Sequence, residues 1–294
     1  MTRIDAAEAI RRRRATMAAR GRSVVPRPLP PDSVQREYLR ELRAMMQALA
    51  RMVREEIDAL PTPRADAPVD GTFGDPLPDD SALRRALLRA AARWFRRFPM
   101  RDLERLGRRI GEATSEHQRR QWTRQVRAAI GVDPTLSEPW LLPEIESFGR
   151  ENANLITKMA QETIDKIQTH VTAATLAGDR HETLAKVLQE RLQVSESRAK
   201  LIARDQVLSF TSDLAATRQQ AAGVTEYIWR TVNDNRVRST HEARAGQRFR
   251  WDTPPPGGHP GTEVLCRCYA EPIIDLTFGL GGPQPGSTPP VLNR

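Results

Sequence analysis

Cysteine is scarce in this chain, whose 294 residues include only Cys266 and Cys268, one residue apart. Two cysteines cannot build the framework of bridges that holds small secreted domains together, and a bridge between residues two apart is strained. The chain also lacks a run of about 18 apolar residues, so we expect no membrane-spanning helix. Residues 1–20 are basic but lack the apolar core and cleavage site of a signal peptide. These absences predict a soluble protein made in a reducing cytoplasm.

Lysine is the second scarcity, because only four of the 46 basic residues are lysine and the rest are arginine. The formal net charge is +9. Arginine suits bidentate contacts with phosphate, although a GC-rich genome also encodes arginine at any basic position. The balance predicts an anionic partner, with nucleic acid as the first candidate, an acidic protein face as the second and a plain solvated surface as the alternative.

Two arginine clusters are candidates for binding such a partner. The first lies in a basic arm over residues 1–31, which ends in an extended proline-rich stretch. The second lies on a predicted helix over residues 81–98 and includes no acidic residue. The candidate binding residues are Arg11, Arg12, Arg13 and Arg14 in the arm, and Arg84, Arg85, Arg89, Arg93, Arg96 and Arg97 on the helix.

Apolar residues recur at spacings of three and four over much of residues 32–222, which is typical of amphipathic helices. We expect helices over residues 32–60, 81–98, 101–130 and 140–177. A capping pair, Asp179 and Glu182, predicts a short helix after Gly178. The stretch "LQVS" at 192–195 is expected to turn the chain before another helix, from Ser195 to about Ala222.

The pattern changes at residue 224, where alternating β-branched and aromatic residues predict strands in "TEYIWRTV", "QRFRW" and "CYAEPII". The predicted fold class is mainly α with a small C-terminal α+β module, in which long helices precede a short antiparallel strand-and-loop unit. The expected organisation is a flexible arm (1–31), an arginine-rich helical region (32–140), a long-helix region (141–223), the module (224–275) and a disordered tail (276–294).

The module contains four residues that suit a structural zinc ion, His241, His259, Cys266 and Cys268. Zinc prefers four ligands drawn from thiolate and imidazole. A module of about 50 residues buries too little apolar surface to be stable without a cross-link such as a bound metal ion. We therefore expect one Zn²⁺ held by this quartet. The alternative is a pair of reduced buried thiols beside two loop histidines that bond to the backbone.

The same segment resembles the Mu protein F-like domain of the phage head morphogenesis family over about residues 180–275. Many relatives have Cys-x-x-Cys where this chain has Arg238 and His241. The resemblance implies a minor head protein of a tailed phage or prophage, built into the virion head at the portal vertex in few copies within a symmetric assembly. Its implied partners are the portal protein, the major capsid protein or both, with double-stranded DNA as a further candidate and no membrane. The matching positions are Trp229, Thr231, Asp234, Arg236, His241, Gly246, Pro254, Pro255, His259, Pro260, Gly261, Cys266, Arg267 and Cys268.

Four motif residues have simple structural interpretations. Trp229 is expected to pack the core of the module. Asp234 can accept hydrogen bonds from the amides of the following turn, and Arg236 can pair with Asp234 or with an acidic residue of a strand. Gly246 is expected to supply a positive φ before the second strand.

An enzyme is the alternative class of protein. Asp234, His241 and His259 would suit a metal-dependent nuclease or hydrolase, and Cys266 activated by His259 would suit a nucleophile. Against this, the histidines have no carboxylate cluster nearby for Mg²⁺, and thiolates are soft ligands for a hard ion. We therefore expect no catalytic residue. A DNA-binding regulator also fits the charge, but no recognition helix stands out.

Overall fold

The computed structural model describes residues 25–60, 80–131, 134, 137–176 and 181–274. The chain packs as two compact units. Unit 1 contains Met1–Val34, Ile110–Ile145 and Arg204–Arg294, and unit 2 contains Gln35–Arg109 and Glu146–Ala203. Helices α4, α5 and α6 therefore contribute residues to both units.

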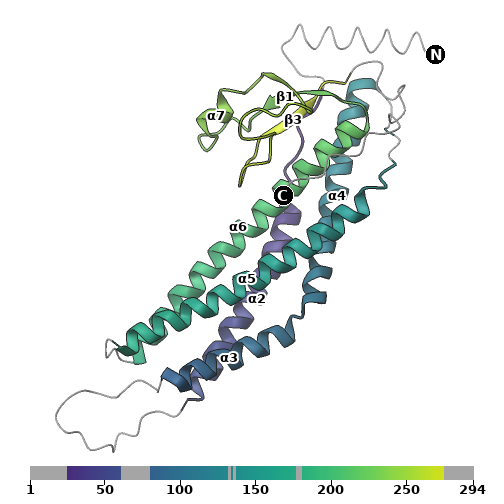
Figure 1. The fold of residues 1–294 in the computed structure, drawn as a ribbon. Coiled ribbons are helices and arrows are strands. Elements are labelled where there is room, and N and C mark those ends of the chain that lie inside the picture. Colours follow the sequence, from purple (N-terminus) through teal and green to yellow (C-terminus); the bar gives the residue numbers. More distant parts are fainter. Residues whose placement is uncertain (1–24, 61–79, 132–133, 135–136, 177–180, 275–294) are drawn as a thin grey trace, which may run out of the picture. The chain divides into compact units, whose positions relative to one another are not determined.

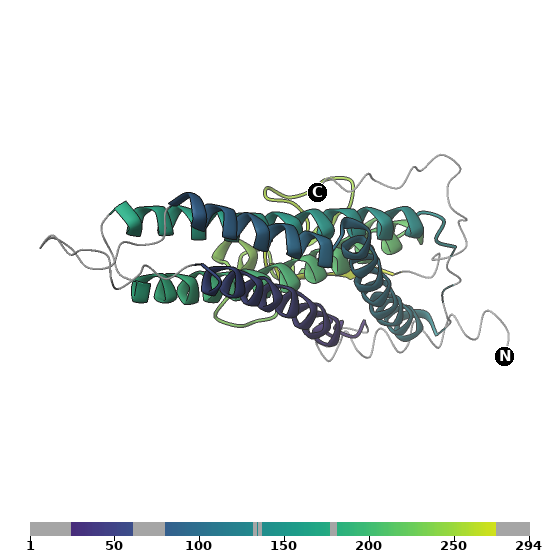
Figure 2. The same ribbon diagram turned by 90° about the horizontal axis from the view of Figure 1, so that it is seen from below.

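Long helices account for most of the described residues (Figures 1 and 2). The prediction of a mainly α fold with a small C-terminal α+β module is confirmed. Within the described ranges, none of the helices combines the length and the apolar character that a membrane span requires. The long helices are α2 (Asp32–Asp58), α3 (Asp80–Arg97), α4 (Met100–Ile130), α5 (Leu141–Leu176) and α6 (His181–Ala221).

Unit 2 is held together by apolar faces and a few buried polar contacts between helices. The indole N–H of Trp94 on α3 donates to the backbone carbonyl of Met45 on α2 at 3.0 Å. Tyr38 on α2 donates from its hydroxyl to Asn152 on α5 at 2.7 Å, and both side chains are fully buried. These bonds satisfy polar groups that would otherwise be buried at a cost of about 1–3 kcal/mol each.

Helices α4 and α5 cross at two glycines, Gly107 and Gly149. A Cβ atom added to Gly107 would lie 2.7 Å from the Cα atom of Gly149, which is closer than real Cβ atoms come to a neighbour. The absence of both side chains therefore lets the two backbones touch.

Helix α6 is continuous through residues 192–195, so the expected turn at "LQVS" is wrong. The stretch contains no glycine or proline that would stop a helix. Ser195 is buried, and its hydroxyl lies 2.8 Å from the hydroxyl of Thr163 on α5. Ser195 therefore bonds across a helix pair inside unit 2 instead of capping a new helix.

Residues 25–31, the end of the expected flexible arm, lie along α4 in unit 1. The backbone N–H of Leu29 donates to Gln121 at 3.1 Å, and Gln125 donates to the carbonyl of Pro26 at 3.2 Å. Side chains of α4 thus supply hydrogen bonds that an extended, proline-rich backbone cannot make to itself. Residues 1–24 with Arg11 to Arg14, the capping residue Asp179 and the expected tail over 276–294 lie outside the described residues.

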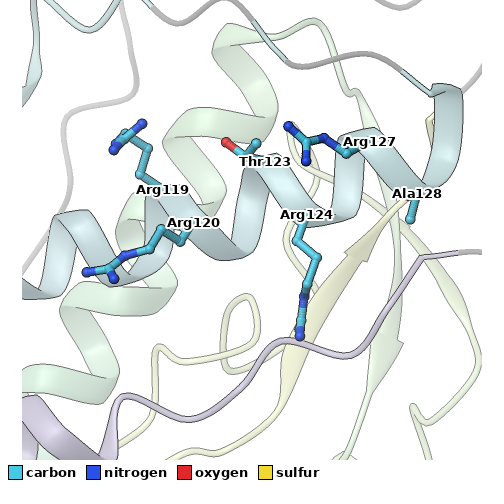
Figure 3. A pocket seen from close by; sticks show the side chains of 6 residues that line it. All are labelled: Arg119, Arg120, Thr123, Arg124, Arg127 and Ala128. Atoms are coloured by element: carbon cyan, nitrogen blue, oxygen red, sulfur yellow. The ribbon is translucent and has the colours of Figure 1, made fainter.

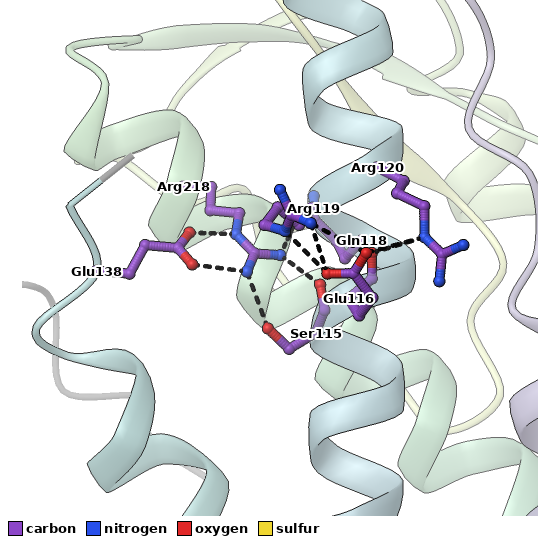
Figure 4. Close-up of polar contacts among 7 residues, drawn as sticks. All are labelled: Ser115, Glu116, Gln118, Arg119, Arg120, Glu138 and Arg218. Carbon is purple, nitrogen blue, oxygen red and sulfur yellow. Dashed lines mark hydrogen bonds and ion pairs between the residues drawn. The ribbon is translucent and has the colours of Figure 1, made fainter. Parts of the chain in front are cut away.

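A buried arginine joins three segments of unit 1 (Figure 4). The guanidinium of Arg218 on α6 donates to both carboxylate oxygens of Glu138, at 2.5 and 3.0 Å. It also donates to the carbonyl and hydroxyl of Ser115 on α4, both at 2.9 Å, and to the amide oxygen of Gln118 at 2.5 Å. This network fixes α4, α6 and the segment before α5 together within the unit.

The strand-and-loop module follows α6 and forms a three-stranded antiparallel sheet in the order β2-β1-β3. The central strand places Tyr227 and Trp229 on one buried face because side chains alternate along a strand. A short helix, which the sequence did not indicate, precedes β2 (Figure 1). The elements are β1 (Glu226–Arg230), α7 (Ser239–Glu242), β2 (Arg248–Arg250) and β3 (Tyr269–Pro272).

Candidate metal centre

Three of the four predicted ligands meet in the buried interior of the module. His241 lies on α7, Cys266 in the loop before β3, and Cys268 immediately before β3. Their exposed fractions are 2%, 5% and 6%. One ligand atom of each lies within 4.8 Å of the other two. Both cysteines are free thiols.

The imidazole ring of His241 is oriented by its surroundings. Its Nδ1 atom lies 3.6 Å from the sulfur of Cys266 and 3.5 Å from the sulfur of Cys268. Its Nε2 atom lies 3.2 Å from the carboxylate of Glu263, which in turn lies 3.2 Å from the guanidinium of Arg238. The ring also meets the indole of Trp229 edge to face, with 5.2 Å between centroids. One nitrogen thus faces two sulfurs and the other faces a carboxylate.

The two thiols differ in acidity because they form a close, buried pair. A hydrogen bond from Cys268 lowers the pKa of Cys266, and backbone N–H groups of Cys268 and Gly261 lower it further against the opposing effect of burial. The pKa of Cys268 is raised by the neighbouring Cys266 sulfur and by burial, while the Trp229 indole opposes this. The two thiols therefore lose their protons as a pair and not as independent groups.

His259, the fourth predicted ligand, is placed in an aromatic cluster and does not join the other three. Its Nδ1 atom forms a hydrogen bond of 2.8 Å with the hydroxyl of Tyr227. Its ring packs on Trp251 with 4.9 Å between centroids. Burial lowers the pKa of His259, so the neutral ring is favoured. The sequence could not separate His259 from His241, because both precede the cysteines in a segment rich in turn-forming residues.

The loop that carries the cysteines is docked on α6. A Cβ atom at Gly261 would lie 2.2 Å from the Cβ atom of Ser212, and the φ of Gly261 is +97°. The backbone N–H of Leu265 donates to the carboxylate of Asp205 at 2.6 Å. Gly261 is therefore required both by its backbone conformation and by the closeness of the helix. The loop and this part of α6 both belong to unit 1.

Four further motif residues lie in the core and turns of the module. Trp229 is fully buried. Asp234 accepts from the backbone N–H of Arg236 at 3.1 Å, and the Arg236 guanidinium lies 3.9 Å from the same carboxylate. Gly246 has a φ of +81°. Arg267 lies between the two cysteines, and its guanidinium donates two hydrogen bonds to Asp234, which hold the backbone of this segment in place.

The predicted basic face of α3 is partly neutralised by α2. Arg89 lies 2.7 Å from Glu56, and Arg93 lies 2.6 Å from Glu55 and 3.1 Å from Glu56. These acids belong to another helix, so the sequence of α3 alone did not reveal the pairing. The four other arginines of this face, Arg84, Arg85, Arg96 and Arg97, are exposed.

A second arginine-lined surface lies on α4 and was missed by the sequence analysis. A groove of about 540 Å³ runs along this helix (Figure 3). Arg119 and Arg120 each lie within 3.2 Å of Glu116, so part of this charge is balanced. The signal was present in the sequence, because residues 117–130 contain four arginines and no acidic residue. The groove is lined by Arg119, Arg120, Thr123, Arg124, Arg127 and Ala128.

Fold and site together define a mainly helical protein that carries a small α+β module with a buried Cys/His cluster. Residues 165–271 match the family model described as Phage Mu protein F like protein. These residues are therefore a Phage Mu protein F-like domain, as the sequence motif indicated.

A curated relative from Haemophilus influenzae (strain ATCC 51907 / DSM 11121 / KW20 / Rd), named "Uncharacterized protein", is 31% identical over 140 residues. The alignment covers 47% of this chain and 31% of the relative, so the chain spans about a third of that protein's length. No solved structure matches the chain.

Proposed function

We propose that this chain is a minor structural protein of the head of a tailed phage or prophage, located at the portal vertex and acting in head morphogenesis. The observation that carries the proposal is the match of residues 165–271 to the Phage Mu protein F like family. Its partners are the portal protein and the major capsid protein of the same phage. It is built into the head in few copies, and a role in DNA packaging or ejection follows from that position.

The distribution of charge supports a partner with an acidic surface. Arg84, Arg85, Arg96 and Arg97 lie exposed on α3, and a separate arginine-lined groove follows α4. The guanidinium group of arginine binds carboxylates and phosphates through two hydrogen bonds at once. The arginine surfaces of α3 and α4 therefore suit an acidic protein face as well as the backbone of DNA.

The two arginine surfaces differ in how much of their charge is already engaged. In the α4 groove, Arg119 and Arg120 pair with Glu116, and Arg124 donates to the backbone carbonyl of Arg27 at 2.5 Å. An arginine that must first release such a neighbour gains less from an incoming anion. We therefore place the stronger contact with the partner on α3.

The site chemistry favours an assembly protein over a nuclease. Among the described residues, the one group of three or more potential metal ligands is made of two thiols and an imidazole. A phosphodiester nuclease of the two-metal kind uses carboxylates around hard cations in an open site. Here the ligands are soft and almost fully buried. This supports a structural role for the cluster and a non-enzymatic role for the chain.

The proposal is tested by binding to purified head components. The full chain is incubated separately with the portal protein and with the major capsid protein encoded by the same phage, and complexes are separated by sedimentation. We expect co-sedimentation with the portal protein at moderate salt. A variant with Arg84, Arg85, Arg96 and Arg97 replaced by Gln is expected to bind more weakly and with a smaller dependence on salt.

A matched control replaces the four arginines of the α4 groove by Gln, which removes the same charge from another helix. Loss of binding in that control but not in the α3 variant would place the contact on α4. Absence of binding to either head protein, at any salt concentration, would contradict the proposed function.

A further inference from the structure

We propose that His241, Cys266 and Cys268 bind one Zn²⁺ ion as a structural centre that joins α7 to the loop before β3. The proposal does not depend on the function proposed above, since it rests on the positions of donor atoms inside the module. The chemistry of the donors supports the proposal, because two thiolates and an imidazole are ligands that zinc prefers.

The distances between the donor atoms also fit a single tetrahedral zinc ion. Zinc–sulfur bonds of about 2.3 Å and zinc–nitrogen bonds of about 2.0–2.1 Å, at tetrahedral angles, separate the nitrogen from each sulfur by about 3.5–3.6 Å. The Nδ1 atom of His241 lies 3.6 Å from the sulfur of Cys266 and 3.5 Å from that of Cys268. Both separations match those of ligands around one tetrahedral ion.

Hydrogen bonds attach only one of the two thiols to His241, and the other thiol bonds to its neighbouring cysteine. A neutral imidazole with its proton on Nε2 offers a single lone pair, on Nδ1. That lone pair can accept from one thiol, so the second sulfur has no proton acceptor on His241. A metal ion placed between the three atoms accounts for both short distances at once.

Charged side chains next to the ligands also suit a metal centre. A metal-bound histidine commonly donates from its other ring nitrogen to a carboxylate. The carboxylate of Glu263 lies 3.2 Å from Nε2 of His241, without the geometry of a hydrogen bond, and is the group within reach for that role. Arg238 holds Glu263 from the far side at 3.2 Å. The ring of His241 thus lies beside a carboxylate, as histidine ligands commonly do in metal centres.

The described part of the chain supplies three donors to this centre, so a fourth tetrahedral position is left for another ligand. His259 does not fill it, because its Nδ1 atom is bonded to the hydroxyl of Tyr227 at 2.8 Å. The centre is therefore distinct from the quartet that the sequence indicated, and the difference between His241 and His259 is what an experiment has to measure.

The test is metal analysis of the full chain. The protein is purified with a reductant that does not bind metal and without a chelator, loaded with Zn²⁺, and then dialysed against metal-free buffer. About one zinc per chain is expected to remain. The Cys266→Ser, Cys268→Ser and His241→Ala variants are expected to lose it, while His259→Ala is expected to keep it. Glu263→Gln leaves all three ligands in place and should weaken zinc affinity about 10–100-fold in competition with a chelator.

Cobalt substitution distinguishes this centre from adventitious binding. Co²⁺ bound to two thiolates is expected to give intense sulfur-to-metal charge-transfer absorption, which falls by about half or more in each single cysteine variant. Circular dichroism of the same variants checks that the helices remain folded. Absence of bound zinc and of cobalt absorption in the folded parent chain would overturn the proposal, as would loss of metal in His259→Ala with retention in His241→Ala.

Discussion

The guanidinium of Arg218 is closed off from solvent, and the carboxylate of Glu138 binds it through two hydrogen bonds of 2.5 and 3.0 Å. Ser115 and Gln118 of α4 accept from the same group (Figure 4). A buried charge whose hydrogen bonds are satisfied is tolerated, whereas a buried charge without its counterion is expensive. The position of α6 against α4 within unit 1 therefore depends on Glu138, a residue that lies outside both helices.

Replacing Glu138 by Ala is expected to destabilise unit 1 by about 3–5 kcal/mol, because the Arg218 charge stays buried without its partner. The measurement is urea unfolding followed by tryptophan fluorescence. The control is Glu116→Ala, which removes exposed ion pairs to Arg119 and Arg120 and should cost less than about 1 kcal/mol. An equal loss in the free energy of unfolding for the two substitutions would show that the buried ion pair contributes no more to stability than the exposed ones.

Replacing Gly261 by Ala is expected to loosen the module from α6. The new Cβ atom would lie 2.2 Å from Ser212, and the φ of +97° is strained for alanine. The two effects together should cost roughly 2–4 kcal/mol. Limited proteolysis within residues 224–274 reports the reduced protection.

A second substitution separates the collision from the backbone strain. Ser212→Gly removes the atoms that the alanine would meet. The double variant, Gly261→Ala with Ser212→Gly, is therefore expected to regain part of the protection against proteolysis. The strained φ at residue 261 remains, so the recovery is expected to be incomplete. No recovery in the double variant would mean that the close approach to α6 contributes little.

The continuity of α6 predicts slow hydrogen exchange across residues 192–196. Amides inside a helix are protected by their bonds to carbonyls four residues earlier, whereas a turn at "LQVS" would expose several of them. Exchange is followed by mass spectrometry on overlapping peptides, with residues 201–210 of the same helix as an internal reference. Protection that drops sharply at 193–195 and recovers after Ser195 would restore the two-helix interpretation.

The pairing of Arg89 and Arg93 predicts which arginines of α3 bind an anion. Binding of double-stranded DNA, measured by fluorescence anisotropy across a salt series, should weaken when Arg84, Arg85, Arg96 and Arg97 are replaced by Gln. The salt slope should fall by about 0.9 for each phosphate that these arginines neutralise in the parent chain.

The matched variant for this DNA experiment is Arg89→Gln/Arg93→Gln. It should change the affinity less, because Glu55 and Glu56 already neutralise those two charges. A larger fall in affinity for the Arg89/Arg93 variant than for the four-arginine variant would contradict the assignment.

Most of the fold could be predicted from the sequence because each helix and strand is specified by the pattern of apolar residues within its own segment. Apolar spacing located four of the helices within one or two residues, and alternation located the three strands. The error at residues 192–195 has a physical cause, since Ser195 looks like a helix cap in sequence but bonds to Thr163, which is 32 residues away. Likewise, the acids that neutralise Arg89 and Arg93 lie on another helix.

The candidate site was predicted in part for the same reason. The Cys-x-Cys pair and the motif around it are contiguous, so the three members of the Cys/His cluster could be named as candidates from the sequence. Choosing between His241 and His259 required knowing that Tyr227 meets one ring and the two cysteines meet the other. Glu263 was invisible as a partner of His241 because its role depends only on the folded loop.

The most direct test of the proposed function is the protein content of purified, DNA-filled heads from a phage that encodes this chain. Quantitative mass spectrometry, with labelled peptides from residues 141–176 as standards, gives its copy number relative to the major capsid protein. We predict that the chain is present in heads, in far fewer copies than the major capsid protein, and that heads without it form in lower yield. Heads of normal yield and content that contain none of this chain would contradict the account.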